Sequence, residues 1–331
     1  MAGLATRFLR AALLFAAWGA GAHTMEDRPV RVATYNVENY VAADRMTDEG
    51  FRPGYPKPER EKAALRAVIR DLAADVLVLQ EMGPRPYLEE LRRDLRTDGA
   101  DYPHAALAAA ADADRHIAIL SRLPLRGVRT HEDLSFAYLG GRETVKRGLL
   151  EAEVDAPGGA FTVFALHLKS RLTEREDDPG SAVRRAAEAV AIRDRILARF
   201  PDPAGAAFLI LGDCNDGRNS RAAAALQRRG RMEIAVLLPA SDSRGEAWTH
   251  AYRRDETYSR VDLILVSGRL LPRVVDGAAR IHDGPGVREA SDHRPVRVDV
   301  SPRWVGNPRA VDQRGETLTG TVTSPAPKPF R

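Results

Sequence analysis

The sequence predicts a mixed α/β fold, with β-sheets in the core and helices outside them. Short apolar segments recur along the chain; tight Gly- and Pro-rich turns join some of them, and long amphipathic segments separate others. Strands joined by both turns and helices are typical of mixed sheets whose faces are covered by helices. The composition supports a packed core, because hydrophobic residues make up 44% of the chain and charged residues 29%, the usual balance of globular domains.

The predicted strands are short apolar runs, or segments in which apolar and polar residues alternate. The run 76–79 is fully apolar, as expected for a buried strand. A turn at 155–159, with the sequence Asp-Ala-Pro-Gly-Gly, joins the strands on either side of it. The predicted strands are 30–35, 76–79, 117–120, 148–154, 161–166, 208–211, 261–266 and 295–300.

Three segments are predicted to be helices. In 59–72 the apolar residues fall on broadly one helical face, and three prolines stand before the segment. A second helix is expected at 87–96. The third, at 181–199, is rich in Ala and Arg. We expect Arg184 and Arg185 of this helix to lie on a solvated face.

The two ends of the chain differ in composition from the middle. Residues 1–22 have the three parts of a bacterial signal peptide: two arginines, an apolar stretch, and small residues up to Ala22. We expect cleavage after Ala22, which predicts an exported protein, periplasmic or secreted. The folded domain is then expected to cover 23–301. Residues 302–331 are rich in Pro and Thr without periodicity, which predicts an extended or disordered tail.

Charge and cysteine content exclude several classes of protein. The formal net charge is +4, and the two leader arginines account for half of it, so charge does not identify a nucleic-acid binder. No apolar run reaches the ~18 residues of a membrane-spanning helix. The single cysteine, Cys214, excludes an intramolecular disulfide framework and a Cys-based zinc cluster. We expect its side chain to lie in the core.

Six polar clusters stand at the ends of predicted strands or within them. The clusters are Asn36 with Asn39, Gln80-Glu81, His167-Leu168-Lys169-Ser170, Gly212-Asp213-Cys214-Asn215-Asp216, Val261-Asp262, and Ser291-Asp292-His293. A carboxylate that ends an apolar strand, as Glu81 does, is costly to bury unless a cation or hydrogen-bond donors neutralise it. Oxygen ligands without thiolates favour Mg²⁺ or Mn²⁺, with Ca²⁺ as a further candidate, over structural zinc.

The ordered set of these motifs resembles the endonuclease/exonuclease/phosphatase superfamily, the group that contains DNase I, abasic-site endonucleases, neutral sphingomyelinases and inositol-polyphosphate phosphatases. Each motif alone is weak, whereas the complete series, from Thr34 to His293, is specific and covers most of the chain. The resemblance implies a DNase I-like four-layer α/β sandwich, in which two packed mixed β-sheets are flanked by helices. It also implies a divalent-metal-dependent enzyme that hydrolyses phosphodiesters.

The resemblance implies a metal site and a catalytic histidine. Glu81 matches the family's metal-binding glutamate, Asn36 its companion amide, and Asp292 a further carboxylate ligand. His293 matches the catalytic histidine, which acts as a base toward water or stabilises the phosphate. Asp262 matches the acid that holds this imidazole in one tautomer.

Further residues match positions that surround the reacting phosphate. Asp213 and Asn215 resemble the pair that orients the nucleophile and binds the scissile phosphate, and some family accounts make Asp213 the base. His167 matches a second histidine, which protonates the leaving group. Arg147 and Lys169 are candidates for contact with the substrate phosphate. The number of metal ions and the choice between histidine and aspartate as base stay open.

The substrate is expected to be DNA or RNA, because the motif variants look most like those of exported bacterial nucleases. No cluster of aromatic and basic residues marks a nucleic-acid groove, however. A sphingomyelinase-like phosphodiesterase, or a phosphatase of lipids or small molecules, shares the same centre and stays an alternative. A third hypothesis is a non-catalytic scaffold that binds phosphoesters, although this chain keeps the catalytic carboxylates and final histidine that such proteins usually lose. We infer no stable protein partner and expect a monomer.

Overall fold

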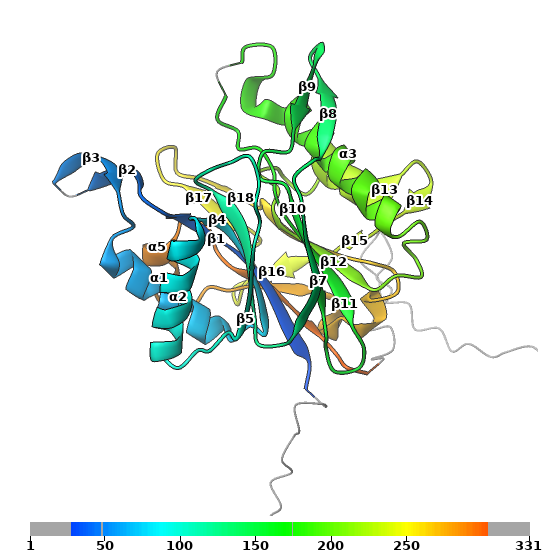
Figure 1. Ribbon diagram of the computed structural model, residues 1–331, viewed down its shortest axis with the longest axis horizontal. Helices are drawn as coiled ribbons and strands as arrows, with labels where there is room; N and C mark the ends of the chain where they lie inside the picture. Colours follow the sequence, from blue (N-terminus) through cyan, green and yellow to red (C-terminus); the bar gives the residue numbers. More distant parts are fainter. Residues whose placement is uncertain (1–27, 48, 174, 304–331) are drawn as a thin grey trace, which may run out of the picture.

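Two large β-sheets pack face to face, and helices cover the outer face of each (Figure 1). The computed structural model describes residues 28–303, except residues 48 and 174. The predicted signal peptide, 1–22, lies outside the described residues, and so does the predicted tail from residue 304 onward. None of the described helices is long and apolar enough to cross a membrane.

The first sheet has seven strands and is mixed, as predicted. Its strands, in order, are β16 (Ala240–Ser241), β20 (Ala279–Ile281), β21 (Val296–Val300), β1 (Val30–Tyr40), β4 (Val76–Met82), β6 (His116–Ser121) and β5 (His104–Leu107). At its centre, β1 runs parallel to β4 and antiparallel to β21.

The second sheet has six strands and is also mixed. Its strands, in order, are β15 (Val236–Leu237), β19 (Asp262–Val266), β12 (Phe208–Asp213), β11 (Phe161–His167), β10 (Leu149–Val154) and β7 (Leu125–His131). β12 runs parallel to β11 and antiparallel to β19. β10 and β11 form an antiparallel pair around the turn predicted at 155–159.

The four layers follow from the alternation of side chains along the strands. In β1, Val30 and Val32 point into the apolar core between the two sheets, whereas Ala33 and Tyr35 point toward the helices outside. The helices are α1 (Glu59–Leu72), α2 (Arg85–Thr97) and α5 (Val287–Ala290) on the first sheet, and α3 (Ala182–Arg199) and α4 (Arg221–Gln227) on the second. The predicted four-layer α/β sandwich is therefore confirmed (Figure 1).

The predicted strands and helices are confirmed to within a few residues, and α1 has the predicted bounds. Sequence periodicity misses the short hairpins at the surface, because a two-stranded ribbon without a buried face imposes no strict alternation. These hairpins are β2 (Ala43–Thr47) with β3 (Gly50–Tyr55), β8 (Ser135–Tyr138) with β9 (Gly141–Thr144), β13 (Arg228–Arg229) with β14 (Met232–Glu233), and β17 (His250–Tyr252) with β18 (Thr257–Ser259).

The expectation that Arg184 and Arg185 lie on a solvated face is wrong. Both residues are buried in α3, where each pairs with a carboxylate: Arg184 with Glu188 at 3.3 Å and Arg185 with Asp216 at 3.2 Å. Arginine is buried in proteins when an acidic partner and further acceptors satisfy its guanidinium. The partner Asp216 is remote in the sequence, so helical spacing alone gives no sign of it.

The register of the sheets brings the predicted site residues to one end of the sandwich. In the parallel pair β1 and β4, Asn36 lies beside Gln80. In the parallel pair β11 and β12, His167 lies beside Asp213. Asp213 lies in turn beside Asp262, the first residue of the antiparallel strand β19. The polar strand ends seen in the sequence therefore become neighbours through β-pairing.

Gly212 allows β12 to pair with β11 directly before Asp213. Its φ is +148°, and a Cβ at this position would lie 1.9 Å from the carbonyl oxygen of Leu166. We expect Gly212→Ala to lower the free energy of unfolding by about 2–4 kcal/mol, because the strand backbone must move to relieve the overlap. Chemical denaturation measures the change. Gly268→Ala is the control, since nothing lies within 4 Å of a Cβ there; equal midpoints for the two variants would contradict the prediction.

Candidate active site

His293 and Asp262 form a buried pair at the centre of the site. His293 Nδ1 lies 2.8 Å from Asp262 Oδ2. The backbone N–H of Asp262 donates to the Thr249 hydroxyl (3.1 Å), which holds this end of β19 in place. Because the carboxylate accepts the proton on Nδ1, the other ring nitrogen is left to face the neighbouring groups. His293 Nε2 lies 3.9 Å from Asp213 Oδ2.

Asp213 is buried beside this pair and is held by amide donors. Its Oδ1 accepts the backbone N–H of Asn215 (2.7 Å), and its Oδ2 accepts the side-chain amides of Asn36 (3.0 Å) and Asn215 (3.2 Å). Between Asp213 and Asn215, Cys214 is buried in the core under the helices, as predicted. Three of the predicted site residues, from two different sheets, therefore share one hydrogen-bond network.

Burial and charge together set the protonation of Asp213 and His293. Burial raises the pKa of Asp213 to about 6, although the positive charge of His293 opposes the rise. Burial lowers the pKa of His293, but the carboxylates of Asp262 and Asp213 outweigh this effect and hold it well above the usual 6.5. His293 is therefore an imidazolium at neutral pH, and it lies next to a carboxylate that titrates near neutrality.

A second group of polar side chains lies around Glu81 at the end of β4. Glu81 Oε1 accepts from the side-chain amide of Asn36 (3.4 Å), and Oε2 accepts from the backbone N–H of Asn39 (2.9 Å). Within the described residues, no Lys or Arg nitrogen forms an ion pair with this half-buried carboxylate. A carboxylate without a cationic partner, next to an amide side chain, is a set of residue types that suits Mg²⁺ or Mn²⁺.

Asp292 lies next to this group, because the serine before it donates its hydroxyl to the carbonyl oxygen of Asn36 (2.8 Å). Asp292 Oδ2 is 3.6 Å from His250 Nε2, and the backbone N–H of Asp292 donates to Glu38 Oε2 (2.9 Å). Burial and the negative charge of Asp292 raise the pKa of Glu38. A divalent cation would offset this crowding of carboxylates. The residue types present therefore fit a divalent metal, and its ligation by Asn36, Glu81 and Asp292 stays a prediction; the described groups of three His or Asp side chains that could hold an ion are His250-Asp292-His293 and Asp213-Asp262-His293.

His167 is buried on the other neighbouring strand, next to Asp213. Its Nε2 lies 3.5 Å from Asp213 Oδ2, and its Nδ1 has no hydrogen-bond partner in the part of the chain described. Burial, together with the positive charge of Arg147, lowers the pKa of His167 well below 6.5, so the ring is neutral at neutral pH. His167 thus belongs to the centre by position, while proton donation to the leaving group stays a prediction.

The side chains of Arg147 and Lys169 are held by other parts of the protein. Arg147 Nε donates to Asp112 (3.2 Å), and its Nη1 donates to the carbonyl oxygen of Leu168 (3.1 Å). Lys169 Nζ donates within its own loop, to Ser170 Oγ (3.1 Å). These bonds satisfy both groups without a phosphate. Contact of either residue with the substrate phosphate therefore stays a prediction.

Backbone strain gathers at the site. The non-glycine residues Glu38, Asn39, Glu81 and Asn215 all have a left-handed backbone, with φ between 49° and 60°. A left-handed backbone at a non-glycine residue costs on the order of 1–3 kcal/mol of folding free energy. It persists where contacts with the surrounding structure hold it in place. Here the contacts are those of the site itself: the Asn36 side-chain oxygen, for example, accepts the backbone N–H of Glu38 (3.0 Å). The strained turns are therefore held by hydrogen bonds of the site, and they orient its polar groups.

Sequence reasoning misses three residues that help to build this site: His250, Thr249 and Glu38. The rings of His250 and His293 lie 4.6 Å apart, and the two residues pair across a β-bridge. Thr249 orders the backbone of Asp262. His250 and Thr249 stand in no recognisable motif, and Glu38 lies between Asn36 and Asn39 without matching a predicted role. The pairing of the short strand β17 with the segment around His293 is long-range, so only the tertiary structure reveals it.

A family model covers this whole site. The model of the endonuclease/exonuclease/phosphatase family matches residues 33–293, a range that contains every predicted metal-binding and catalytic residue. The chain belongs to this family. Members of the endonuclease/exonuclease/phosphatase superfamily are metal-dependent phosphoesterases, among them nucleases, sphingomyelinases and phosphatases. Among curated proteins, none matches the sequence.

Solved structures of low sequence identity share the endonuclease/exonuclease/phosphatase fold. Sphingomyelinase C from Streptomyces griseocarneus is 18% identical, with a TM-score of 0.56 over 82% of this chain and 99% of that one. A family protein from Leptotrichia buccalis is 16% identical, with a TM-score of 0.55 over 82% and 99%. A mutant beta toxin from Staphylococcus aureus with bound magnesium ions is 12% identical, with a TM-score of 0.58 over 82% and 100%.

The Glu81 carboxylate is expected to control metal affinity. Glu81→Gln should raise the metal concentration for half-maximal activity about 10–100-fold, because it removes a negative charge and turns an amide toward the donors of Asn36 and Asn39. Titration of activity with Mg²⁺ or Mn²⁺ measures the shift. The control is Glu89→Gln on the exposed surface of α2. An unchanged titration for Glu81→Gln would show that this carboxylate is only structural.

Proposed function

We propose that this family member is an exported nuclease, which hydrolyses phosphodiester bonds of DNA or RNA with the help of a divalent metal. The observation that carries the hydrolytic part is the single network of His293, Asp262 and Asp213 beside Asn36 and Glu81. Every polar group that the chemistry requires is present in that network. This completeness favours an enzyme over a non-catalytic scaffold.

Asn36, Glu81 and Asp292 would hold the metal in this scheme. When bound, the metal supplies charge neutralisation on the phosphate oxygens and lowers the pKa of water. The buried His293 imidazolium adds a positive charge, and its Nε2 is free to donate to a phosphate oxygen because Nδ1 is bonded to Asp262. Both effects favour attack on an otherwise anionic and unreactive diester.

The proton transfers fall to Asp213 and the two histidines. Attack by water on phosphorus forms one P–O bond, breaks another, and requires the water to lose a proton while the leaving oxygen gains one. Asp213, oriented by Asn36 and Asn215, accepts the proton of the water, and His293 stabilises the charge on the phosphate. The neutral His167 ring, whose Nε2 lies 3.5 Å from the same carboxylate, would take up this proton from Asp213 and pass a proton to the leaving oxygen.

The extent of the space beside the centre favours a long substrate. A hollow of about 830 Å³ begins at Glu38 and Asn39 and extends along the β2–β3 hairpin. Its lining includes arginines that can contact successive phosphates of an extended chain, interspersed with carboxylates. The arginines are Arg45, Arg60, Arg253 and Arg288, and the carboxylates are those of Glu38, Asp44, Glu49, Glu61 and Glu289. A substrate with one phosphate would use only a small part of this hollow.

A lipid phosphodiester is the second candidate, and one observation favours it. The β2–β3 hairpin projects from the body of the protein (Figure 1), and Met46 and Phe51 on it are 77% and 62% exposed. Exposed apolar side chains on a projecting hairpin are suited to contact with a membrane surface. The structural neighbours include a sphingomyelinase C, whose fold this chain shares.

Activity of the purified protein on matched substrates separates these functions. With Mg²⁺ or Mn²⁺, we expect plasmid DNA and RNA to be cleaved, no cleavage in EDTA, and slower release of phosphocholine from sphingomyelin vesicles. Survival of the nucleic acids while sphingomyelin is cleaved would overturn the nuclease in favour of the lipid enzyme. Inactivity toward all substrates and metals would favour the scaffold. Export is checked separately, by N-terminal sequencing of the secreted protein, which should begin at His23.

A further inference from the structure

Beside the catalytic segment lies a hollow with arginines on its rim and an aromatic wall, and the chemistry described so far does not use it. We propose that this hollow binds the nucleobase and sugar-phosphate of the nucleotide next to the scissile bond. The inference rests on the proposed nuclease function and deepens it, since it names a nucleotide rather than any phosphoester as the group recognised.

The hollow joins the active site directly. It consists of two adjacent spaces of about 220 and 180 Å³, which share Trp248, Val287, Arg288 and Arg294 as lining residues. The second space also borders Asp292, the predicted metal ligand that follows Ser291. A group attached to a phosphate at the metal site would therefore enter this hollow without leaving the protein surface.

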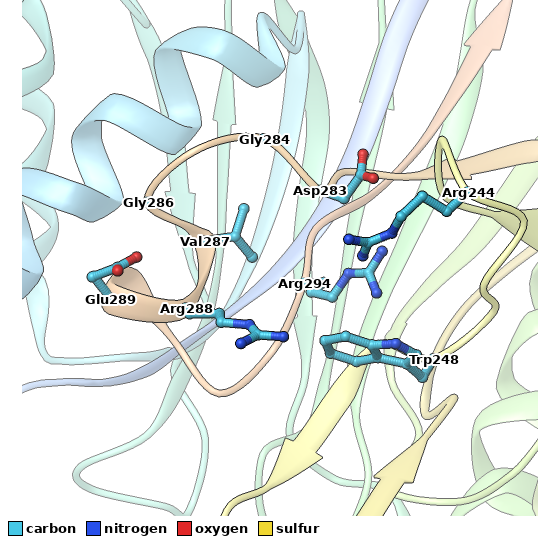
Figure 2. A pocket seen from close by; sticks show the side chains of 9 residues that line it. All are labelled: Arg244, Trp248, Asp283, Gly284, Gly286, Val287, Arg288, Glu289 and Arg294. Atoms are coloured by element: carbon cyan, nitrogen blue, oxygen red, sulfur yellow. The ribbon is translucent and has the colours of Figure 1, made fainter.

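One wall of the hollow is aromatic. Trp248 and Tyr258 lie against each other with ring centroids 4.8 Å apart, and Tyr258 is 56% exposed. The Arg294 guanidinium lies 4.0 Å from the centroid of the Trp248 ring and holds that ring in place (Figure 2). An exposed aromatic ring supported from behind by a rigid partner provides a platform on which a base can stack.

Some arginines that line the hollow have carboxylate partners, and others form no ion pair in the described residues. Arg294 is 97% buried; its Nη2 donates to Asp242 (2.7 Å), whereas its Nε and Nη1 have no hydrogen-bond partner in the described residues. Arg244 is paired with Asp242 and Glu246. Arg288, in contrast, forms no ion pair within the described ranges, and its guanidinium extends toward Trp248 (Figure 2). The hollow therefore offers, beside an aromatic wall, an arginine that has no ion-pair partner in the described residues, although the carboxylates of Asp283 and Glu289 also line the hollow.

This combination favours a nucleotide over a lipid. Arg253, which also lines the space next to Asp292, donates to the backbone oxygen of Arg288 and forms no ion pair with a carboxylate in the described part of the chain. Two such arginines can bind the next phosphate, while a base stacks on Tyr258. An acyl chain would need an apolar surface, yet Val287 and Ala251 are the only aliphatic side chains among the lining residues.

Two substrates with the same leaving group test the proposal. Thymidine 5′-(p-nitrophenyl phosphate) carries a nucleoside on the reacting phosphate, and methyl p-nitrophenyl phosphate carries a methyl group instead. For Tyr258→Ala and for Arg288→Gln, we expect kcat/KM to fall about tenfold more on the nucleoside ester than on the methyl ester. Tyr258→Phe keeps the ring and should behave as wild type. Arg93→Gln, on the exposed surface of α2, is the control for loss of an arginine.

Binding without catalysis makes failure of this proposal distinct from failure of the nuclease function. In EDTA, a labelled oligothymidylate should bind about tenfold more weakly to Tyr258→Ala and Arg288→Gln than to wild type, as measured by fluorescence anisotropy. Variant-sensitive binding by a protein that hydrolyses no nucleotide would uphold the subsite and overturn the nuclease. Two outcomes would overturn the subsite. In the first, the variants lose the same factor in kcat/KM on both esters. In the second, they bind sphingomyelin vesicles more weakly but bind the oligothymidylate as wild type does.

Discussion

Replacement of His293 by alanine is expected to lower kcat by about 10²–10⁴-fold, the loss that removal of an acid–base or charge-stabilising group typically causes. The His293 ring is the group that joins Asp262 to Asp213, at 2.8 and 3.9 Å. Without it, the imidazolium charge that would face the phosphate is lost, and of the two histidines next to Asp213 only the neutral His167 remains. Steady-state kinetics on plasmid DNA or on the nucleoside ester measure the loss.

Folding of the His293→Ala protein must be checked alongside its kinetics. The substitution leaves the buried Asp262 carboxylate without its partner, so some loss of stability is expected. Denaturant midpoints quantify that loss, and the kinetics are compared under conditions in which both proteins are folded. His104→Ala is the matched control, because His104 lies at the opposite end of the first sheet, beside Ser121. Retained activity in folded His293→Ala would contradict the assignment.

Asp213→Asn is expected to cause a loss of similar size, about 10²–10⁴-fold in kcat. Both oxygens of Asp213 accept hydrogen bonds from amides of Asn36 and Asn215. An asparagine at this position turns one acceptor into a donor that faces other donors, and it removes the carboxylate that receives the proton of water. The variant therefore loses both the base and its orientation.

A second measurement on Asp213→Asn reports on the site without any turnover. The carboxylates of Asp262 and Asp213 raise the pKa of His293, so removal of the Asp213 charge should lower that pKa. An NMR titration of the histidine resonances in metal-free protein measures the change. Asp299→Asn, at the far end of β21, is the control and should leave the pKa of His293 unchanged. A pKa of His293 that does not move in Asp213→Asn would show that the two groups are not coupled.

Much of the fold could be predicted because the buried sheets require regular patterns. The fully apolar run of β4 and the alternation in β1 are what two-sided burial and a two-faced sheet demand. Exposed ribbons such as β2–β3 have no such requirement, and their existence depends on contacts with the rest of the protein. The burial of Arg185 follows from its pairing with Asp216 on a different segment, which helical spacing does not encode.

The residues of the candidate site likewise fall into those that could be predicted from the sequence and those that could not. Glu81 and Asp213 could be found because each lies at the end of an apolar strand at a cost that needs an explanation, and His293 could be found through the family motif Ser291-Asp292-His293. His250 and Trp248 could not, since their value comes from what lies against them: His293 for the first, Arg294 and Tyr258 for the second. The arginines of the hollow likewise stand singly in the sequence and converge only through β17 and α5.

The sequence by itself therefore determined the family, the mixed sheets and the set of groups available for chemistry, because these depend on residue type and on local order. Only the tertiary structure decided how those groups share protons and charge. Asp213 lies at the end of β12 and His293 in the segment before β21, and their protonation depends on burial and on each other. The tertiary structure also decided that an aromatic wall and arginines without ion-pair partners among the described residues border the active site. Distances between segments remote in the chain govern electrostatics and packing, and a local pattern carries no measure of them.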